Sequence, residues 1–238
     1  MNTILNNLVL IKKRIAIACK KSSRNADEVK LLLATKTVTP DKIKIALAAG
    51  EILIGENKVQ ELKEKFEVLK SLPHQTHFIG HLQTNKIKEV LKYVDCIQSV
   101  DRIELAEKMQ RRLELENKTI DVFLQVNTFN EASKFGIAPE KTIDFAMQVK
   151  QLDRLQIKGL MTIGLFSSEN EKICRCFRLL KTLQQQMLDK DIPIYELSMG
   201  MSKDLETAIE EGATIVRVGT SIFGKRTYPD SYYWNENK

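Results

Sequence analysis

The sequence is poor in cysteine, proline and aromatic residues, with four cysteines, five prolines and 6% Phe, Trp and Tyr among 238 residues. So few cysteines, without framework spacing, exclude a disulfide-stapled domain. No apolar run approaches the roughly 20 residues that cross a bilayer. The N-terminal segment has neither a basic start before an apolar core nor a small-residue cleavage site, so it is no secretory signal. We therefore expect a cytoplasmic protein without membrane contact.

Charged residues are plentiful, with 37 Lys and Arg against 31 Asp and Glu and a net charge of +6. Because the lysines are spread along the chain and aromatics are few, a small anionic ligand fits this excess better than RNA or DNA. His74, His77 and His81 flank a predicted strand and do not converge on a metal. Cys174 and Cys176 lie two apart on a predicted helix and point apart. We expect no metal and no nucleic acid.

Apolar segments alternate with amphipathic ones along the chain. The spacing predicts a first helix over Asn2–Lys21, followed by eight buried strands separated by helices. The apolar face of this helix is predicted to hold Leu5, Leu8, Ile11, Ile15 and Ala18. The predicted strands are 31–36, 52–54, 76–79, 94–98, 120–126, 155–162, 194–197 and 214–218. Eight such units predict a single (β/α)8 TIM barrel over residues 1–238, with an extra N-terminal helix. An open doubly wound sheet is the alternative, but its GxGxxG fingerprint is absent.

Polar residues stand at every predicted strand end, where barrels place their chemistry. They are Lys36, Asn57, His81, Ser99, Asn127, Thr162, Ser198 and Arg217. The run LLLATK brings Lys36 to the edge of a buried strand, where desolvation favours the neutral amine that attacks carbonyls in Schiff-base chemistry. A lysine whose amine simply reaches solvent is the alternative. Glu56, at the second strand end, either orients a basic group such as Lys36 or is exposed.

The last two strand ends predict an anion site. Gly219 allows close backbone approach, and Thr220 and Ser221 supply hydroxyls at the start of a short helix, where barrels bind phosphate. The alternative is a turn glycine followed by a capping threonine. Closure places strand one beside strand eight, so Lys36 would face this site. A small molecule that carries both an aldehyde and a phosphate could bind the Lys36 amine and the anion site at once. Pyridoxal 5′-phosphate (PLP) is such a molecule, and Arg217 would lie beneath its ring, between the two groups.

With these residues the chain resembles a known family, the pyridoxal phosphate homeostasis proteins (the YggS or PROSC family), whose barrel is similar to the N-terminal domain of alanine racemase. The matching stretches, in order, are LLLATK, GENKVQE (55–61), HFIGHLQTNK (77–86), IQSVD (97–101), EASKFGI (131–137), GLMTIG (159–164), LSMGMSKDLETAIEEG (197–212) and RVGTSIFGKR (217–226). They cover the chain from about residue 31 to residue 226.

The resemblance implies a set of cofactor-binding residues. Lys36 would form the internal aldimine with PLP, and Arg217 would face the pyridine nitrogen. The other implied residues are Ser198, Gly219 and Thr220 around the phosphate, and Asn57, His81 and Met199 near the cofactor. Because an arginine stays protonated, the ring nitrogen it faces is discouraged from taking a proton, and the ring becomes a weaker electron sink.

Three functions remain open at this point. The first is a monomeric PLP carrier that supplies apo-enzymes without robust catalysis. The second is a PLP-dependent amino-acid racemase, which needs a second proton-transfer group on the face opposite the lysine. The third is a Schiff-base aldolase. Lys134 either faces the opening as a second amine or is a solvated loop lysine. The tail tyrosines Tyr228, Tyr232 and Tyr233 either cover the site or pack elsewhere.

Overall fold

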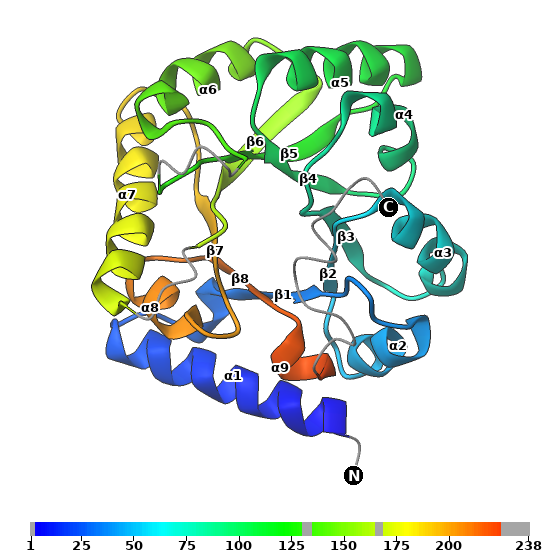
Figure 1. Ribbon diagram of the computed structural model, residues 1–238, viewed down its shortest axis with the longest axis vertical. Helices are drawn as coiled ribbons and strands as arrows, with labels where there is room; N and C mark the ends of the chain where they lie inside the picture. Colours follow the sequence, from blue (N-terminus) through cyan, green and yellow to red (C-terminus); the bar gives the residue numbers. More distant parts are fainter. Residues whose placement is uncertain (1–2, 130–134, 165–168, 225–238) are drawn as a thin grey trace.

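The computed structural model describes residues 3–129, 135–164 and 169–224. Its eight parallel strands form a closed barrel in sequence order, and helices surround the ring (Figure 1). The strands are β1 (Lys30–Ala34), β2 (Leu53–Glu56), β3 (Gln75–Phe78), β4 (Cys96–Val100), β5 (Ile120–Gln125), β6 (Leu155–Met161), β7 (Glu196–Met201) and β8 (Ile215–Val218). The predicted (β/α)8 barrel is therefore confirmed.

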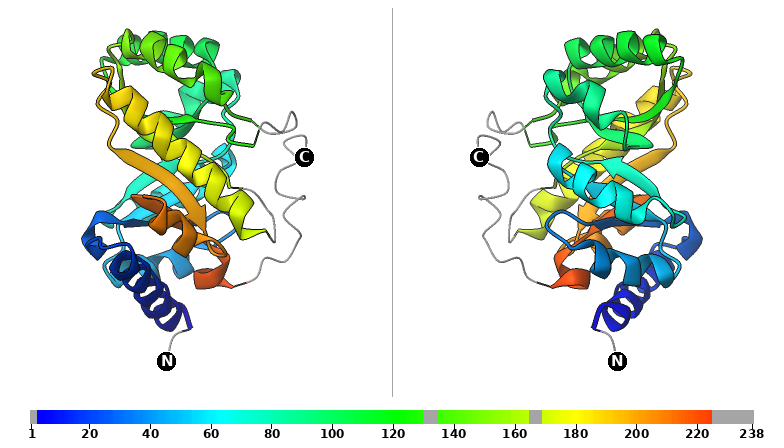
Figure 2. Two further views of the ribbon diagram at one scale, coloured as in Figure 1. Left: turned by 90° about the vertical axis from the view of Figure 1, so that its left-hand side faces the viewer. Right: turned by 90° about the vertical axis from the view of Figure 1, so that its right-hand side faces the viewer.

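The helices fill the connections between successive strands. The α-helices are α1 (Thr3–Lys21), α2 (Pro40–Ala48), α3 (Val59–Leu69), α4 (Ile87–Val90), α5 (Ile103–Glu116), α6 (Thr142–Lys150), α7 (Asn170–Leu188), α8 (Leu205–Glu210) and α9 (Thr220–Phe223). Short 3₁₀ turns are η1 (Ala26–Glu28), η2 (Thr84–Lys86) and η3 (Pro139–Lys141). In the side views α7 runs diagonally along the outside of the barrel (Figure 2).

Strand alternation divides the apolar residues into two cores. On β1, Leu31 and Leu33 belong to the large core between the sheet and the helices, whereas Leu32 belongs to a small core inside the barrel. The small core consists of Leu32, Leu53, Cys96, Phe123, Met161 and Ile215. Because successive side chains of a strand point to opposite faces, this division tells us which later residues of each strand face the barrel axis.

The N-terminal helix α1 lies outside the ring and packs against α2, α8 and α9 (Figure 1). Its buried residues are Ile4, Leu8, Ile11, Ile15, Ala18 and Cys19. The predicted face is thus correct except at Leu5, which is 39% exposed while Ile4 is buried. The observed positions 4, 8, 11, 15 and 18 are spaced by four and three residues in turn, which follows the 3.6-residue period of the helix. The predicted set began with two successive spacings of three, which turns Leu5 away from the buried face.

The largest boundary difference is in β7. The prediction ended this strand at Leu197, whereas the structure continues it to Met201. Gly200 has φ +88° inside this segment, and a β-carbon there would lie 2.4 Å from that of Ala208. Ser198 and Gly200 are residue types common in turns, so the sequence predicted that the strand had already ended. The structure shows instead that Gly200 lies within the strand, where it allows α8 to pack closely. Ser198 therefore lies in the middle of β7 and not at its end.

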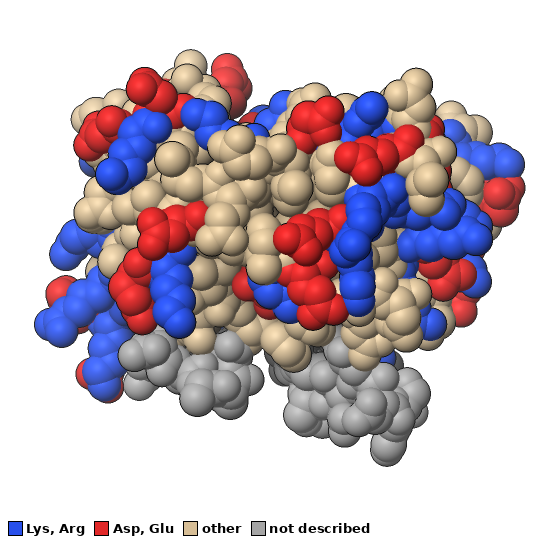
Figure 3. Space-filling view, turned by 90° about the horizontal axis from the view of Figure 1, so that it is seen from above, with Lys and Arg blue, Asp and Glu red and all other residues tan. Residues whose placement is uncertain are grey.

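Surface charge is mixed on the face shown in Figure 3, where Lys and Arg side chains are interspersed with Asp and Glu. Among helices built from described residues, none combines the length and apolar character of a membrane-crossing segment. No disulfide joins the four cysteines, all of which the structure describes; Cys19, Cys96 and Cys176 are buried, and Cys174 is partly exposed.

Candidate functional site

The carboxyl ends of β1 and β8 meet at one mouth of the barrel. Leu33 pairs in register with Val218, so the residues after each strand continue side by side. A β-carbon built on Gly219 would lie 2.8 Å from the carbonyl oxygen of Ala34 and 3.3 Å from its β-carbon. Only glycine fits such an approach. The close contact brings the start of the predicted anion site beside the segment that carries Lys36.

Lys36 lies two residues beyond β1, in a tight turn. The Thr35 carbonyl accepts a hydrogen bond from the Val38 amide at 2.9 Å, which closes the turn. Thr35 directs its hydroxyl to the outer face of the sheet, where it donates to a carboxylate oxygen of Glu56 at 2.6 Å. Lys36 follows directly as the first central residue of the turn and is half-buried.

Two short polar side chains, Thr220 and Ser202, lie together beside Gly219, and we call these three residues the cradle. The Thr220 hydroxyl lies 3.4 Å from that of Ser202, and α9 begins directly after Gly219. The first helical hydrogen bonds run from Ile222 and Phe223 to the Gly219 carbonyl. Thr220 and the neighbouring Ser221 precede those bonds, so their N–H groups have no acceptor within the helix.

Helix α1 supports this cradle from outside. Arg14 donates to the Ser202 carbonyl at 3.1 Å and forms two hydrogen bonds with the Glu206 carboxylate, at 2.6 and 2.8 Å. The Asn7 amide donates to the Ile222 carbonyl at 2.9 Å. The extra helix therefore fixes both segments that contribute hydroxyls to the cradle.

A chain of hydrogen bonds crosses the barrel below the mouth. Arg217 donates to the Ser198 hydroxyl at 2.8 Å and to the Thr162 carbonyl at 2.7 Å. The Ser198 hydroxyl donates to the side-chain oxygen Oε1 of Gln98 at 2.6 Å, and the side-chain nitrogen Nε2 of Gln98 lies 2.7 Å from Nδ1 of His77. Since the amide nitrogen can only donate, Nδ1 accepts and His77 is neutral with its proton on Nε2. We call Arg217, Ser198, Gln98 and His77 the inner chain.

Burial controls the charges of the inner chain. Desolvation lowers the pKa of Arg217 to about 10, opposed by the attraction of Asp204, so the guanidinium stays charged at neutral pH. Desolvation, reinforced by the positive charge of Lys30, lowers the pKa of His77 to about 4. The inner chain thus combines one buried cation with a neutral imidazole.

Asn57 and His81 flank the mouth on the side of β2 and β3. Asn57 has a buried side-chain oxygen with no hydrogen-bond partner among the described residues. A β-carbon on Gly80 would lie 2.3 Å from the Asn57 carbonyl oxygen, so the two loops are in close contact. The His81 ring stacks on Phe135 with centroids 3.6 Å apart, and its Nδ1 lies 3.7 Å from an Asp101 carboxylate oxygen.

Two predicted site residues lie elsewhere than expected. Ser198 is fully buried within the inner chain, so its hydroxyl is committed to Gln98 and Arg217 below the mouth. Met199 is also fully buried and packs in the outer core between sheet and helices. Because its side chain faces away from the barrel axis, a contact between Met199 and a ligand in the mouth can come only from its backbone.

Ser202, which sequence reasoning did not select, lies beside Thr220 instead. The register between β7 and β8 shifts from Ser198 opposite Ile215 to Met201 opposite Arg217. This irregularity gives β7 one more residue than β8 over the interval and brings Ser202 to the level of the cradle. The segment LSMGMS contains two serines, Ser198 and Ser202, and either could supply a hydroxyl to the cradle. The bulge in β7 decides that Ser202 does so.

Glu56 is 1% exposed and orients a basic group, although that group is Lys65 of α3 and not Lys36. Their oxygen and nitrogen atoms lie 2.7 Å apart. Burial raises the pKa of Glu56 to about 7, against the lowering effect of Lys65. Lys134 and the three tail tyrosines lie outside the described residues.

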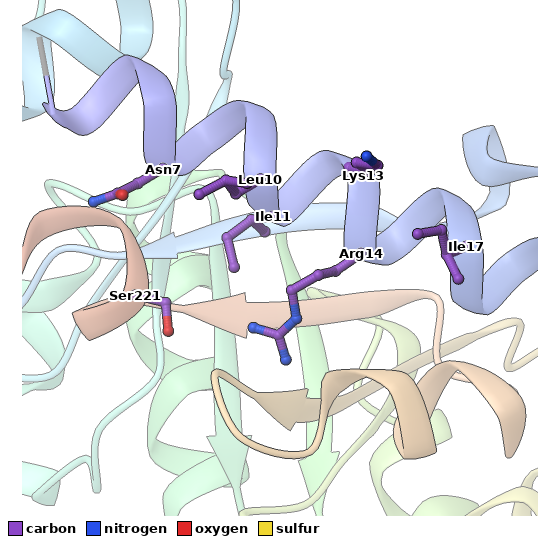
Figure 4. A pocket seen from close by; sticks show the side chains of 7 residues that line it. All are labelled: Asn7, Leu10, Ile11, Lys13, Arg14, Ile17 and Ser221. Atoms are coloured by element: carbon purple, nitrogen blue, oxygen red, sulfur yellow. The ribbon is translucent and has the colours of Figure 1, made fainter.

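A separate cavity of about 330 Å³ lies between α1 and α9 (Figure 4). Its lining residues are Asn7, Leu10, Ile11, Lys13, Arg14, Ile17 and Ser221. It is therefore on the outer side of the cradle, and the strand-end residues Lys36, Asn57 and Arg217 do not line it. The chemistry predicted from the sequence belongs to the mouth and not to this cavity.

Comparison with known proteins gives concordant results. Residues 13–227 match the family model "Alanine racemase, N-terminal domain". The pyridoxal phosphate homeostasis protein of Aquifex aeolicus is 41% identical over 219 residues, covering 92% of this chain and 96% of the relative. That of Escherichia coli K12 is 35% identical over 231 residues, covering 96% and 99%.

Solved structures agree with these matches. PipY of Synechococcus elongatus, determined with PLP bound, superposes with a TM-score of 0.80 at 34% identity, covering 90% of this chain and all of PipY. An alanine racemase of Clostridium difficile superposes with a TM-score of 0.77 at 13% identity, covering 97% of this chain and 57% of the racemase. At that identity the racemase supports the fold alone.

Proposed function

The chain belongs to the family of pyridoxal phosphate homeostasis proteins, and on that premise we propose that it binds PLP covalently through Lys36, as part of PLP homeostasis. The observation that carries the proposal is the contact between Gly219 and Ala34, which joins the lysine segment to the anion cradle. Residues 1–238 would form one PLP-binding domain, acting in the cytoplasm as a monomer.

The residues at the mouth fit this cofactor. Gly219 leaves room for a close backbone approach, and Thr220 with Ser202 supplies hydroxyl donors suited to a phosphate. The buried Asn57 oxygen, which has no partner among the described residues, would accept a hydrogen bond from a donor on a ligand in the mouth. Bound PLP supplies an aldehyde that condenses with a lysine amine to a Schiff base.

Arg217 sets the electronic character of the site. A guanidinium has five N–H donors and no acceptor, and two of its donors are held by Ser198 and Thr162. With a pKa of about 10 it stays protonated, so a ring nitrogen facing it has to accept a hydrogen bond. Such a nitrogen does not take up a proton, and the ring is then a poor electron sink.

This weak sink favours a carrier over an enzyme. Carbanion chemistry needs a ring that withdraws electrons, whereas storage and delivery need only a reversible covalent link. Lys36 would hold the aldehyde, the cradle would hold the phosphate, and an apo-enzyme would receive the cofactor.

Reduction with borohydride followed by peptide mass spectrometry tests the assignment. We expect one pyridoxyl group per chain, on the peptide containing Lys36, and no visible absorbance band in Lys36→Ala. A band that survives this substitution, or a pyridoxyl group on another lysine, contradicts the proposal. Lys42→Ala, an exposed lysine of α2, is the matched control.

Solvent exchange separates the carrier from a racemase. The holo-protein is incubated with L-alanine and other L-amino acids in deuterated water. A carrier leaves the α-proton in place, whereas exchange at enzymatic turnover identifies a racemase. Transfer of PLP to an apo-transaminase faster than free dissociation supports delivery by contact.

A further inference from the structure

The turn that holds Lys36 has an unusual backbone. Lys36 and Thr37 are its central residues, and Thr37 has φ +64° while Lys36 has no positive φ. A positive angle at the second central position is typical of a type II turn, where glycine is the usual residue. A β-branched threonine is disfavoured in this region, because its β-carbon crowds the carbonyl oxygen that follows it. The conformation therefore needs support from outside the turn.

That support comes from a buried ionic cluster on the outer face of the sheet, formed by Glu56 of β2 with Glu61 and Lys65 of α3, which we call the outer triad. Lys65 donates to Glu56 at 2.7 Å and to Glu61 at 2.6 Å. Its third donor goes to the Thr35 carbonyl at 2.8 Å. An ammonium group has three donors, so every one is used.

The outer triad contacts the turn on both sides of Lys36. Before it, the Thr35 carbonyl accepts from Lys65 and the Thr35 hydroxyl donates to Glu56. After it, the Thr37 amide donates to the Glu61 carboxylate at 2.6 Å. Two hydrogen bonds to backbone groups and one from the Thr35 hydroxyl thus fix the residues that flank Lys36, and the same Glu61 oxygen joins the Thr37 amide to Lys65.

We propose that Lys65 is a positioning residue for Lys36: by binding Thr35 and aligning Glu61 under Thr37, it holds the turn that presents the Lys36 amine to its aldehyde ligand. This inference rests on the function proposed above. Lys65 does not touch the ligand, because its side chain lies on the outer face, whereas the mouth lies inside the strands. Its 6% exposure makes a role as a solvent-facing lysine untenable.

The consequence is kinetic as well as energetic. Attack on an aldehyde requires the amine within about 3–3.5 Å of the carbonyl carbon, and a displacement of about 1 Å can cost on the order of 100-fold in rate. When the hydrogen bonds of the outer triad to the turn are lost, Thr37 can leave the left-handed region, and the backbone of Lys36 moves with it. Phosphate binding does not depend on this turn, since its hydroxyl donors are Ser202, which follows β7, and Thr220 of α9.

The test compares two ligands on wild type, Lys65→Met and Lys63→Met. PLP reports covalent attachment, followed by stopped-flow absorbance, while pyridoxine 5′-phosphate lacks the aldehyde and reports only noncovalent binding. We expect Lys65→Met to attach PLP about 10–100-fold more slowly, with pyridoxine 5′-phosphate affinity unchanged. Lys63 is exposed on the same helix and pairs with Glu89, so Lys63→Met should match wild type in both measurements.

Each result has a separate meaning. If wild type forms no adduct at Lys36, the proposed function fails. If wild type attaches PLP there and Lys65→Met does so at the same rate, the positioning role is overturned while the function stands. An equal loss for both ligands shows general damage and also overturns it. Should Lys65→Met not fold, Glu61→Ala decides by the same criteria, because it removes the acceptor of the Thr37 amide while Lys65 still pairs with Glu56.

Discussion

Two buried polar networks lie on opposite faces of the barrel sheet, on different strands, and differ in kind. The outer triad is ionic, and its lysine uses every donor on charged or carbonyl oxygens. The inner chain is directional and mostly neutral, passing from Arg217 through Ser198 and Gln98 to His77. The outer triad holds the backbone turn that contains Lys36, and the inner chain holds the side chain of Arg217. The amine and the guanidinium are therefore positioned by two separate networks.

The largest expected difference between the networks is in stability. Lys65→Met leaves Glu56 buried without its cation, and we expect the free energy of unfolding to fall by about 3–5 kcal/mol at pH 8. At pH 6 the loss should be smaller, because the carboxyl group can keep its proton. Urea unfolding at both pH values measures this. Lys63→Met, which breaks an exposed pair, should change the free energy of unfolding little at either pH; an equal loss in both variants would refute the buried role.

The inner chain should lose stability in acid. His77 has a native pKa of about 4 against an ordinary value of 6.5, so between these values the unfolded chain binds more protons. The free energy of unfolding should therefore decrease as pH falls from 6.5 to 4, by up to about 3 kcal/mol. His77→Gln should flatten this decrease, measured by urea unfolding, whereas His74→Gln should retain it. A slope that survives His77→Gln would locate the effect elsewhere.

The outer triad should respond in the opposite direction. Burial raises the pKa of Glu56 from 4.5 to about 7, so between these values the native protein binds more protons than the unfolded chain. The contribution of Glu56 should then decrease as pH rises from 4.5 to 7. We expect the difference between wild type and Glu56→Gln to show this slope. Glu64→Gln, on the exposed face of α3, should not change it.

The smallest expected effect comes from cutting the inner chain at its neutral link. Gln98→Leu leaves the Ser198 hydroxyl and His77 without their partner, at a cost of about 1–3 kcal/mol. Unlike the loss in Lys65→Met, this one should be equal at pH 6 and pH 8, since His77 stays neutral over that range. Thermal unfolding at the two pH values measures it, with exposed Gln156→Leu as control. A pH-dependent cost would show that the chain contains a further ionising group.

The sequence predicted the barrel and the strand-end chemistry for one physical reason. Buried parallel strands are apolar runs that stop at polar residues, so Lys36, Gly219 and Arg217 could be assigned to one mouth from strand order alone. Ser198 could not be separated from Ser202, because a bulge in β7 decides which of them reaches the cradle. Lys65 looked like any helical lysine, since its burial depends on how α3 packs against the end of β1.

The support of the cradle by α1 has a consequence for how the protein is made. Asn7 and Arg14 bind carbonyls that lie 215 and 188 residues further along the chain. A ribosome therefore releases the first helix long before its partners exist, and contacts so distant in sequence form late in folding. The support of the cradle by α1 can therefore form only after Ser202 and Ile222 have been synthesised.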